Sequence, residues 1–260
     1  MEKVTSRDGT KIAFEKAGQG QPIILVDAAL CYRASGPMGP LAKVLEPHFA
    51  VFSYDRRGRG DSGDTQPYTV EREVEDIEAL IKEAGGSAFV YGFSSGAALA
   101  IYAAKRLRSI KKLALYEAPF TLGENSRQAS KDYTAKLTKL LTAGRRGDAV
   151  ALFMTMVGTP AEAVDGMRQA PMWSGLEAIA PTLAYDNAIM GDGSVPTEQA
   201  AAITVSTLVM DGGGSPAFMH DAAQALMEAI PNAHHHTLEG QTHDVAPEVL
   251  APVLVQFFNK

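Results

Sequence analysis

A serine placed between two glycines is the feature of this chain most able to do chemistry. The pattern is Gly-x-Ser-x-Gly, with Gly92 and Gly96 on either side of Ser94. A serine hydroxyl is a poor nucleophile unless it is exposed, held still and placed beside a base. A sharp turn from a strand into a helix would expose and hold Ser94, and only glycine avoids a clash two residues to either side. The pattern therefore predicts that Ser94 is a nucleophile.

The residues around this serine have the composition that such a turn requires. Phe89–Tyr91 is an apolar run typical of a strand, and the small residues that follow Ser94 favour a helix over Ser95–Arg106. The free N–H groups at the start of that helix, together with the positive end of its dipole, would face the place where negative charge develops.

Composition bounds the class of protein. The chain has 260 residues, of which 46% are hydrophobic and 21% charged, as is usual for a globular protein with a large core. A net charge of −6 provides no basic surface for nucleic acid or an anionic membrane, and a single cysteine excludes an intrachain disulfide framework. The charged N-terminus has no apolar signal segment, and the longest apolar run, 97–104, is too short to span a bilayer. We therefore expect a cytoplasmic protein.

Apolar runs and amphipathic stretches alternate along most of the chain. Strands are predicted at 10–15, 22–26, 49–54, 89–91, 112–116, 207–210 and 234–238. Helices are predicted at 41–45, 70–84, 95–106, 217–230 and 247–258. This alternation predicts an α/β fold, with a mostly parallel central sheet and helices on both faces.

The segment 118–202 interrupts the alternation. It has no convincing buried strand, and helices are predicted at 133–142, 148–156 and 161–169. Ligands of open α/β sheets bind beyond the carboxyl ends of the strands, so an insertion that follows a strand can cover the site. The segment contains Trp173 and five methionines, which either pack it onto the core or form an adaptable apolar pocket over Ser94.

The order of these pieces resembles the α/β-hydrolase superfamily over nearly the whole chain. Three segments carry the resemblance: the serine turn at 92–96, the loop 55–62 with its Asp-Arg-Arg-Gly-Arg-Gly-Asp-Ser sequence, and the loop Gly240–His243 after the last strand. The loop 55–62 is similar to the Asp-x-Arg-Gly-x-Gly-x-Ser loop of that superfamily. The resemblance implies a hydrolase core at 1–117 and 203–260, a helical cap at 118–202, and a serine–histidine–acid triad that needs no cofactor or metal.

The resemblance makes His243 the general base, but the acid departs from the common pattern. The family usually places an aspartate in the loop after the strand at 207–210. Here that position holds Ser215, which cannot carry the negative charge that stabilises an imidazolium. Some members place their acid at the end of the neighbouring strand, where this chain has Glu117. We favour Glu117, with Asp211 as the alternative and a dyad without a carboxylate as the third possibility.

The expected oxyanion hole also departs from the family pattern. The family often has His-Gly after the first buried parallel strand, whereas this chain has Asp27-Ala28-Ala29. Backbone N–H groups bind an oxyanion, so the side chains are not decisive, and by position Ala29 and Ser95 would be the donors. Cys31, close by, has no obvious activating neighbour and is expected to be a packing residue.

Together these residues predict a serine hydrolase that acts on a small, largely apolar ester or related acyl compound. A C–C bond hydrolase, a lyase or a perhydrolase would use the same serine. A ligand-binding or signalling module with a hydrolase pocket and little turnover would account for Ser215. The expected partner is a small-molecule substrate, with no nucleic acid and no membrane, and the oligomeric state is left open.

Overall fold

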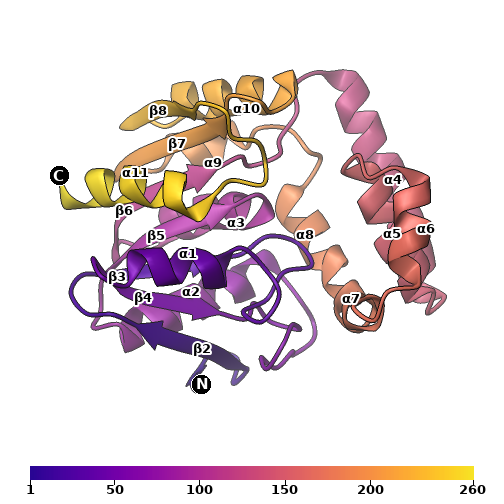
Figure 1. Ribbon diagram of the computed structural model, residues 1–260, viewed down its shortest axis with the longest axis horizontal. Coiled ribbons are helices and arrows are strands. Elements are labelled where there is room, and N and C mark those ends of the chain that lie inside the picture. The colour runs from indigo at the N-terminus through magenta and orange to yellow at the C-terminus, as the bar shows by residue number, and fades with distance from the viewer.

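The core of the computed structural model is one eight-stranded sheet in the order β1-β2-β4-β3-β5-β6-β7-β8 (Figure 1). The structure describes residues 1–260, apart from the side chain of Asn125. β1 pairs antiparallel with β2, and β2 with β4, whereas all the other neighbours are parallel. The strands are β1 Glu2–Thr5, β2 Lys11–Ala17, β3 Pro22–Val26, β4 Ala50–Tyr54, β5 Ala88–Phe93, β6 Ile110–Tyr116, β7 Ser206–Gly212 and β8 Ala233–Leu238.

Helices cover both faces of the sheet because its central strands are apolar on both sides. All five residues of β4 are buried, and so are four of the five residues of β3. One face packs against α1 Met38–Leu45 and α11 Pro247–Asn259. The other face packs against α2 Val70–Glu83, α3 Ser95–Arg106 and α10 Ala217–Ala229. The predicted fold class is confirmed.

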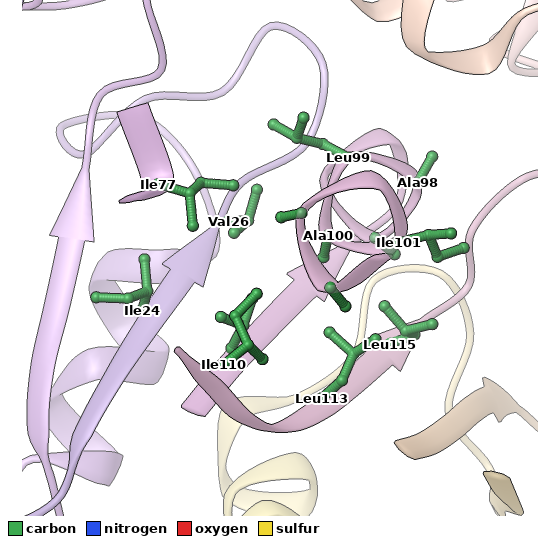
Figure 2. Packing of buried hydrophobic residues seen from close by; sticks show 14 of the residues in the cluster. Ile24, Val26, Ile77, Ala98, Leu99, Ala100, Ile101, Ile110, Leu113 and Leu115 are labelled. Atoms are coloured by element: carbon green, nitrogen blue, oxygen red, sulfur yellow. The ribbon is translucent and has the colours of Figure 1, made fainter. Parts of the chain in front are cut away.

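Helix α3 lies close to the sheet because its residues are small. Ala97, Ala98, Ala100 and Ala103 are completely buried, and Leu99 and Ile101 fill the space on either side. Figure 2 shows Ala98, Leu99, Ala100 and Ile101 of α3 between Val26 of β3 and Leu113 and Leu115 of β6, and all of these residues belong to one apolar cluster. This packing fixes the start of α3, and with it the residue that links β5 to α3.

A group of helices lies between β6 and β7 in the chain. Figure 1 shows α4 to α7 gathered beyond one end of the sheet, with α8 between them and α3. They share an apolar cluster built around Leu137, Val150, Trp173 and Leu176, and this cluster also includes Leu30 from the loop after β3. The elements are α4 Glu124–Thr142, α5 Arg146–Met156, α6 Ala161–Arg168, α7 Trp173–Ile179, the 3₁₀ turn Ala180–Thr182, α8 Leu183–Met190 and α9 Thr197–Ala201.

The predicted elements differ from the observed ones mainly at their ends and in the region between β6 and β7. Helix α4 begins at Glu124, nine residues before its predicted start, and the short elements β1, α7, α8 and α9 were not predicted. Helices of five to eight residues are marginal by themselves and depend on tertiary packing, so the periodicity of the chain gives little sign of them. Among the residues described, the helices are all too short or too polar to cross a membrane.

Candidate active site

Ser94 is the single residue between β5 and α3, and its backbone is strained. Its φ of 55° and ψ of −125° lie in a region that residues with a side chain seldom adopt. Its N–H donates to the carbonyl of Tyr116 at 2.9 Å, which ties the turn to the end of β6. The predicted sharp turn is present, and the side chain of Ser94 is partly exposed at its tip.

The two flanking glycines allow this turn. A Cβ at Gly92 would lie 2.7 Å from the Cα of Ala97, and a Cβ at Gly96 would overlap the carbonyl oxygens of Val26 and Asp27. Real Cβ atoms do not come so close to backbone atoms, so any other residue at either position would force the turn apart. The glycines therefore set how closely α3 approaches β3 and β5.

His243 is brought to the serine by the loop after β8. Its Nε2 lies 3.2 Å from the Oγ of Ser94. A hydrogen bond joins this loop to the end of β6, because the hydroxyl of Tyr116 donates to the carbonyl of Thr242 at 2.6 Å. On one side the ring of Phe93 packs against the imidazole, with 4.8 Å between ring centroids. These contacts fix the orientation of the imidazole.

Glu117 holds the other nitrogen of the imidazole. Its Oε2 lies 2.7 Å from Nδ1 of His243, and its Oε1 accepts the N–H of Gly212 at 2.8 Å. Burial opposes the charge on Glu117, but the hydrogen bonds from His243 and Gly212 outweigh it, so the pKa of this carboxyl lies below its ordinary value. Glu117 follows β6 directly and is 2% exposed, with a φ of 45°. The structure thus brings together the three residues predicted for catalysis.

Asp211, the alternative acid, lies elsewhere. It is part of β7, and its Oδ2 is 2.7 Å from Nδ1 of His220 and 3.3 Å from Nε2 of His235. The structure therefore does not bring Asp211 to His243. The strand β7 continues two residues further than predicted, to Gly212, so Asp211 belongs to the sheet and not to the loop that follows.

The two predicted oxyanion donors come from two different segments of the chain. Ser95 begins α3, and Ala29 lies in the loop after β3, where Asp27 accepts the N–H of Ala28 at 2.8 Å. Among the described residues, neither the N–H of Ala29 nor that of Ser95 donates to a protein group. Leu30, the next residue of the loop, has a φ of 56°. Strained backbone at Leu30, Ser94 and Glu117 is thus concentrated around this site.

Cys31 is a packing residue in the structure, as the sequence indicated. Burial, and to a smaller extent the carboxyl of Asp27, raise the pKa of its thiol to about 12, so no reactive thiolate forms. Burial also raises the pKa of Asp27, to about 6, against the opposing effects of the Ala28 amide and of Arg59.

The sequence reasoning missed a set of buried charges beside the site. Arg56 and Arg59 of the loop 55–62 are each 1% exposed, and both contact Asp186 of α8. Three arginines in eight residues were a possible signal, but charged residues are usually predicted at the surface. The acidic partner lies far away in the sequence, within the helices between β6 and β7.

A strained serine at a strand-to-helix turn, a histidine within reach and a carboxylate behind it, all at one edge of a mostly parallel sheet, define the α/β-hydrolase class of architecture. The chain belongs to the alpha/beta hydrolase family, whose model matches residues 20–253. The predicted resemblance is confirmed.

Solved structures agree with this assignment. The chain is similar to an alpha/beta hydrolase from Sphaerobacter thermophilus DSM 20745, with 54% identity over 99% of this chain and 100% of that chain and a TM-score of 0.89. It shares its fold with an esterase from Exiguobacterium antarcticum, at 18% identity over 99% of each chain and a TM-score of 0.73. It also shares its fold with an enol-lactonase from Burkholderia xenovorans LB400, at 21% identity over the whole of each chain and a TM-score of 0.73.

Proposed function

We propose that this protein is a serine hydrolase that cleaves a small, largely apolar ester or related acyl compound through an acyl-enzyme. The observation that carries the proposal is the continuous line of contacts from Ser94 Oγ through His243 to Glu117, with separations of 3.2 Å and 2.7 Å. Family membership supports hydrolysis, and the proteins of similar fold named as esterase and enol-lactonase act on acyl–oxygen bonds.

Each residue of this line has one chemical task in the proposed reaction. Ser94 attacks the carbonyl carbon while Nε2 of His243 takes the serine proton. Glu117 keeps the second imidazole proton on Nδ1 and stabilises the imidazolium by its charge. The oxyanion forms against the N–H groups of Ala29 and Ser95. His243 then protonates the leaving group, and water hydrolyses the acyl-enzyme by the same route.

The helices between β6 and β7 form the proposed cap, residues 118–202, on a core of residues 1–117 and 203–260. Their apolar cluster includes Ala29, Leu30 and Tyr32 of the oxyanion loop. Partly buried side chains of Tyr133, Phe153, Met154 and Met167 belong to the same cluster. Apolar side chains beside the oxyanion loop support a largely apolar acyl or alcohol group in the substrate.

A low-turnover binding module was suggested by Ser215 at the usual position of the acid. The contact between Glu117 and His243 supplies a carboxylate from the neighbouring strand, so this departure no longer favours binding without turnover. Hydrolysis is therefore the function that we propose.

The test compares Ser94→Ala with the wild type on a series of p-nitrophenyl esters from acetate to octanoate. We expect kcat/KM to fall by roughly a thousandfold or more, because residues of a triad act as a unit. Ser174→Ala is the matched control, since this serine of α7 is exposed and donates only to the carbonyl of Pro171. If Ser94→Ala keeps most of the activity, the serine mechanism is wrong.

A further inference from the structure

Four charged side chains are buried together next to the serine turn. Arg56, Arg59 and Glu73 are each 1% exposed, and Asp186 is 5% exposed. Buried charges are costly unless each is paired and hydrogen-bonded. Here two guanidinium groups balance two carboxylates. The proposed reaction uses none of these groups, so their presence beside the site requires another explanation.

Asp186 is the residue that joins this cluster to the serine turn. One oxygen, Oδ1, accepts hydrogen bonds from Arg56 at 2.7 Å and from the hydroxyl of Ser95 at 2.8 Å. The other, Oδ2, accepts from Arg59 at 2.6 Å. Burial opposes the charge on Asp186, but Arg59 and Arg56 outweigh it and keep the pKa of this carboxyl below its ordinary value. The ionised carboxylate of Asp186 therefore joins α8 to the loop 55–62 and to the start of α3.

Arg59 continues the connection into the oxyanion loop. Its Nη1 donates to the carbonyl of Ala28 and, at 3.3 Å, to that of Cys31. Arg56 donates to the preceding carbonyl, that of Asp27, at 3.2 Å. The carbonyl of Ala28 and the N–H of Ala29 belong to one planar trans peptide and point in opposite directions. A guanidinium that fixes this carbonyl therefore also fixes the direction of the Ala29 N–H.

Ser95 provides a second connection between Asp186 and the proposed oxyanion hole. The Ser95 hydroxyl donates to Asp186, and the backbone N–H of this residue is the other proposed oxyanion donor. Asp186 thus contacts the residue that carries one donor, and contacts the arginine that orients the peptide carrying the other. No other carboxylate in the described chain has hydrogen bonds of this kind to both.

We propose that Asp186 is a positioning residue for the oxyanion hole: through Arg59 and the Ser95 hydroxyl, helix α8 sets the direction of the Ala29 and Ser95 amides. This inference rests on the proposed hydrolase function. It assigns to the helices between β6 and β7 a part in the chemical step in addition to substrate binding. Correct placement of two amides matters because a preorganised donor acts most strongly on the charge that forms in the transition state.

The test is Asp186→Asn, which keeps the shape of the side chain and removes its charge. We measure kcat per active serine, counted by stoichiometric fluorophosphonate labelling, together with KM and the inhibition constant of an aryl trifluoromethyl ketone. Complete loss of one oxyanion donor costs about 10²–10³ in kcat, so misdirection should lower kcat by roughly 10- to 100-fold. We expect KM to change less than about threefold, and the ketone, which forms an oxyanion on the serine, to bind more weakly by the same factor as kcat/KM falls.

Asp148→Asn is the matched control. Asp148 of α5 also accepts two arginine hydrogen bonds, from Arg145 at 2.7 Å and Arg168 at 2.8 Å, but these pairs are partly exposed and involve no residue of the loop after β3 or of the serine turn. It should leave kcat per serine and ketone binding unchanged. If Asp186 has a purely structural role, Asp186→Asn should lower the melting temperature or the fraction of labelled protein. It should then leave kcat per serine and ketone binding unchanged, and that result would overturn the proposal.

Ser95→Ala decides the question even if Asp186→Asn does not fold, because it leaves every buried charge paired. It removes only one of the two routes, so we expect kcat to fall about fivefold at constant KM. An unchanged kcat in this variant would also overturn the proposal. Failure of the hydrolase function itself would be visible in the wild type, as absence of labelling at Ser94, and is therefore distinguishable from failure of this inference.

Discussion

Replacing Glu117 by glutamine removes one negative charge from the site and changes its shape very little. The direction in which the new amide points is decided by Gly212, whose N–H donates to Oε1 at 2.8 Å. The glutamine oxygen must take this position, so its NH₂ group faces Nδ1 of His243, where the carboxylate oxygen now lies at 2.7 Å. The neutral imidazole must then accept at Nδ1 and carry its proton on Nε2, which faces Ser94. In that form it cannot take the serine proton.

The expected loss of kcat/KM depends on how His243 could still act as a base in this variant, and each possibility is costly. Turning the amide over places an NH₂ group against the N–H of Gly212 and leaves buried donors unpaired, at about 1–3 kcal/mol each. In either orientation the imidazolium loses its counter-charge. We therefore expect kcat/KM to fall by roughly 10³–10⁴, which corresponds to about 4–5.5 kcal/mol of transition-state stabilisation.

The assay is steady-state hydrolysis of p-nitrophenyl butyrate at pH 8, with circular dichroism to confirm that each variant is folded. Asp211→Asn is the control, because Asp211 contacts His220 and His235 and not His243. It should cost less than about threefold, since it leaves the tautomer of His243 unchanged. Retention of more than about a tenth of the activity in Glu117→Gln, or a large loss in Asp211→Asn, would show that Glu117 does not orient His243.

Three further variants test other parts of the account. Gly96→Ala should lower kcat/KM in the ester assay by about a hundredfold, because the methyl group overlaps the carbonyls of Val26 and Asp27 and shifts the serine turn; near-normal activity would contradict the clash. Trp173→Ala should lower the free energy of unfolding in urea by roughly 3–5 kcal/mol, because this side chain is 6% exposed inside the cluster of α4–α7; a change below about 1 kcal/mol would contradict that packing. Burial raises the pKa of Asp27 from 3.8 to about 6, so the folded state binds this proton more tightly than the unfolded state, and its contribution to stability is lost as pH rises from about 4 to about 6. Asp27→Asn should remove this fall, which is worth about 3 kcal/mol, from urea titrations at pH 4 and pH 8; an unchanged difference between the two pH values would contradict it.

The elements that position Ser94 could be predicted because their signals are local. Gly92 and Gly96 mark the turn, and continuous apolar runs such as Ile23–Val26 are typical of strands that are covered on both faces. Glu117 could be proposed because it ends the strand that follows α3, and neighbouring parallel strands end at the same edge of the sheet. His243, in contrast, was found only through the resemblance, since one loop histidine among six has no distinguishing local pattern.

The buried charge cluster could not be predicted because it depends on tertiary placement. Arg59 and Asp186 are 127 residues apart, and each would be assigned to the surface if judged alone. Their pairing depends on α8 lying against α3, which is a matter of how the short helices pack and not of their own sequence periodicity. Arg59 and Asp186, the proposed positioning residues, were therefore harder to predict from the sequence than Ser94 and Glu117.

Activation of Ser94 as a nucleophile can be measured by treating the wild-type protein with a fluorophosphonate and mapping the adduct by tandem mass spectrometry. We expect a single, stoichiometric adduct on Ser94, which is absent from Ser94→Ala and forms much more slowly in Glu117→Gln, since phosphonylation needs the same base. An unmodified wild-type protein, or an adduct on any other residue, would contradict it.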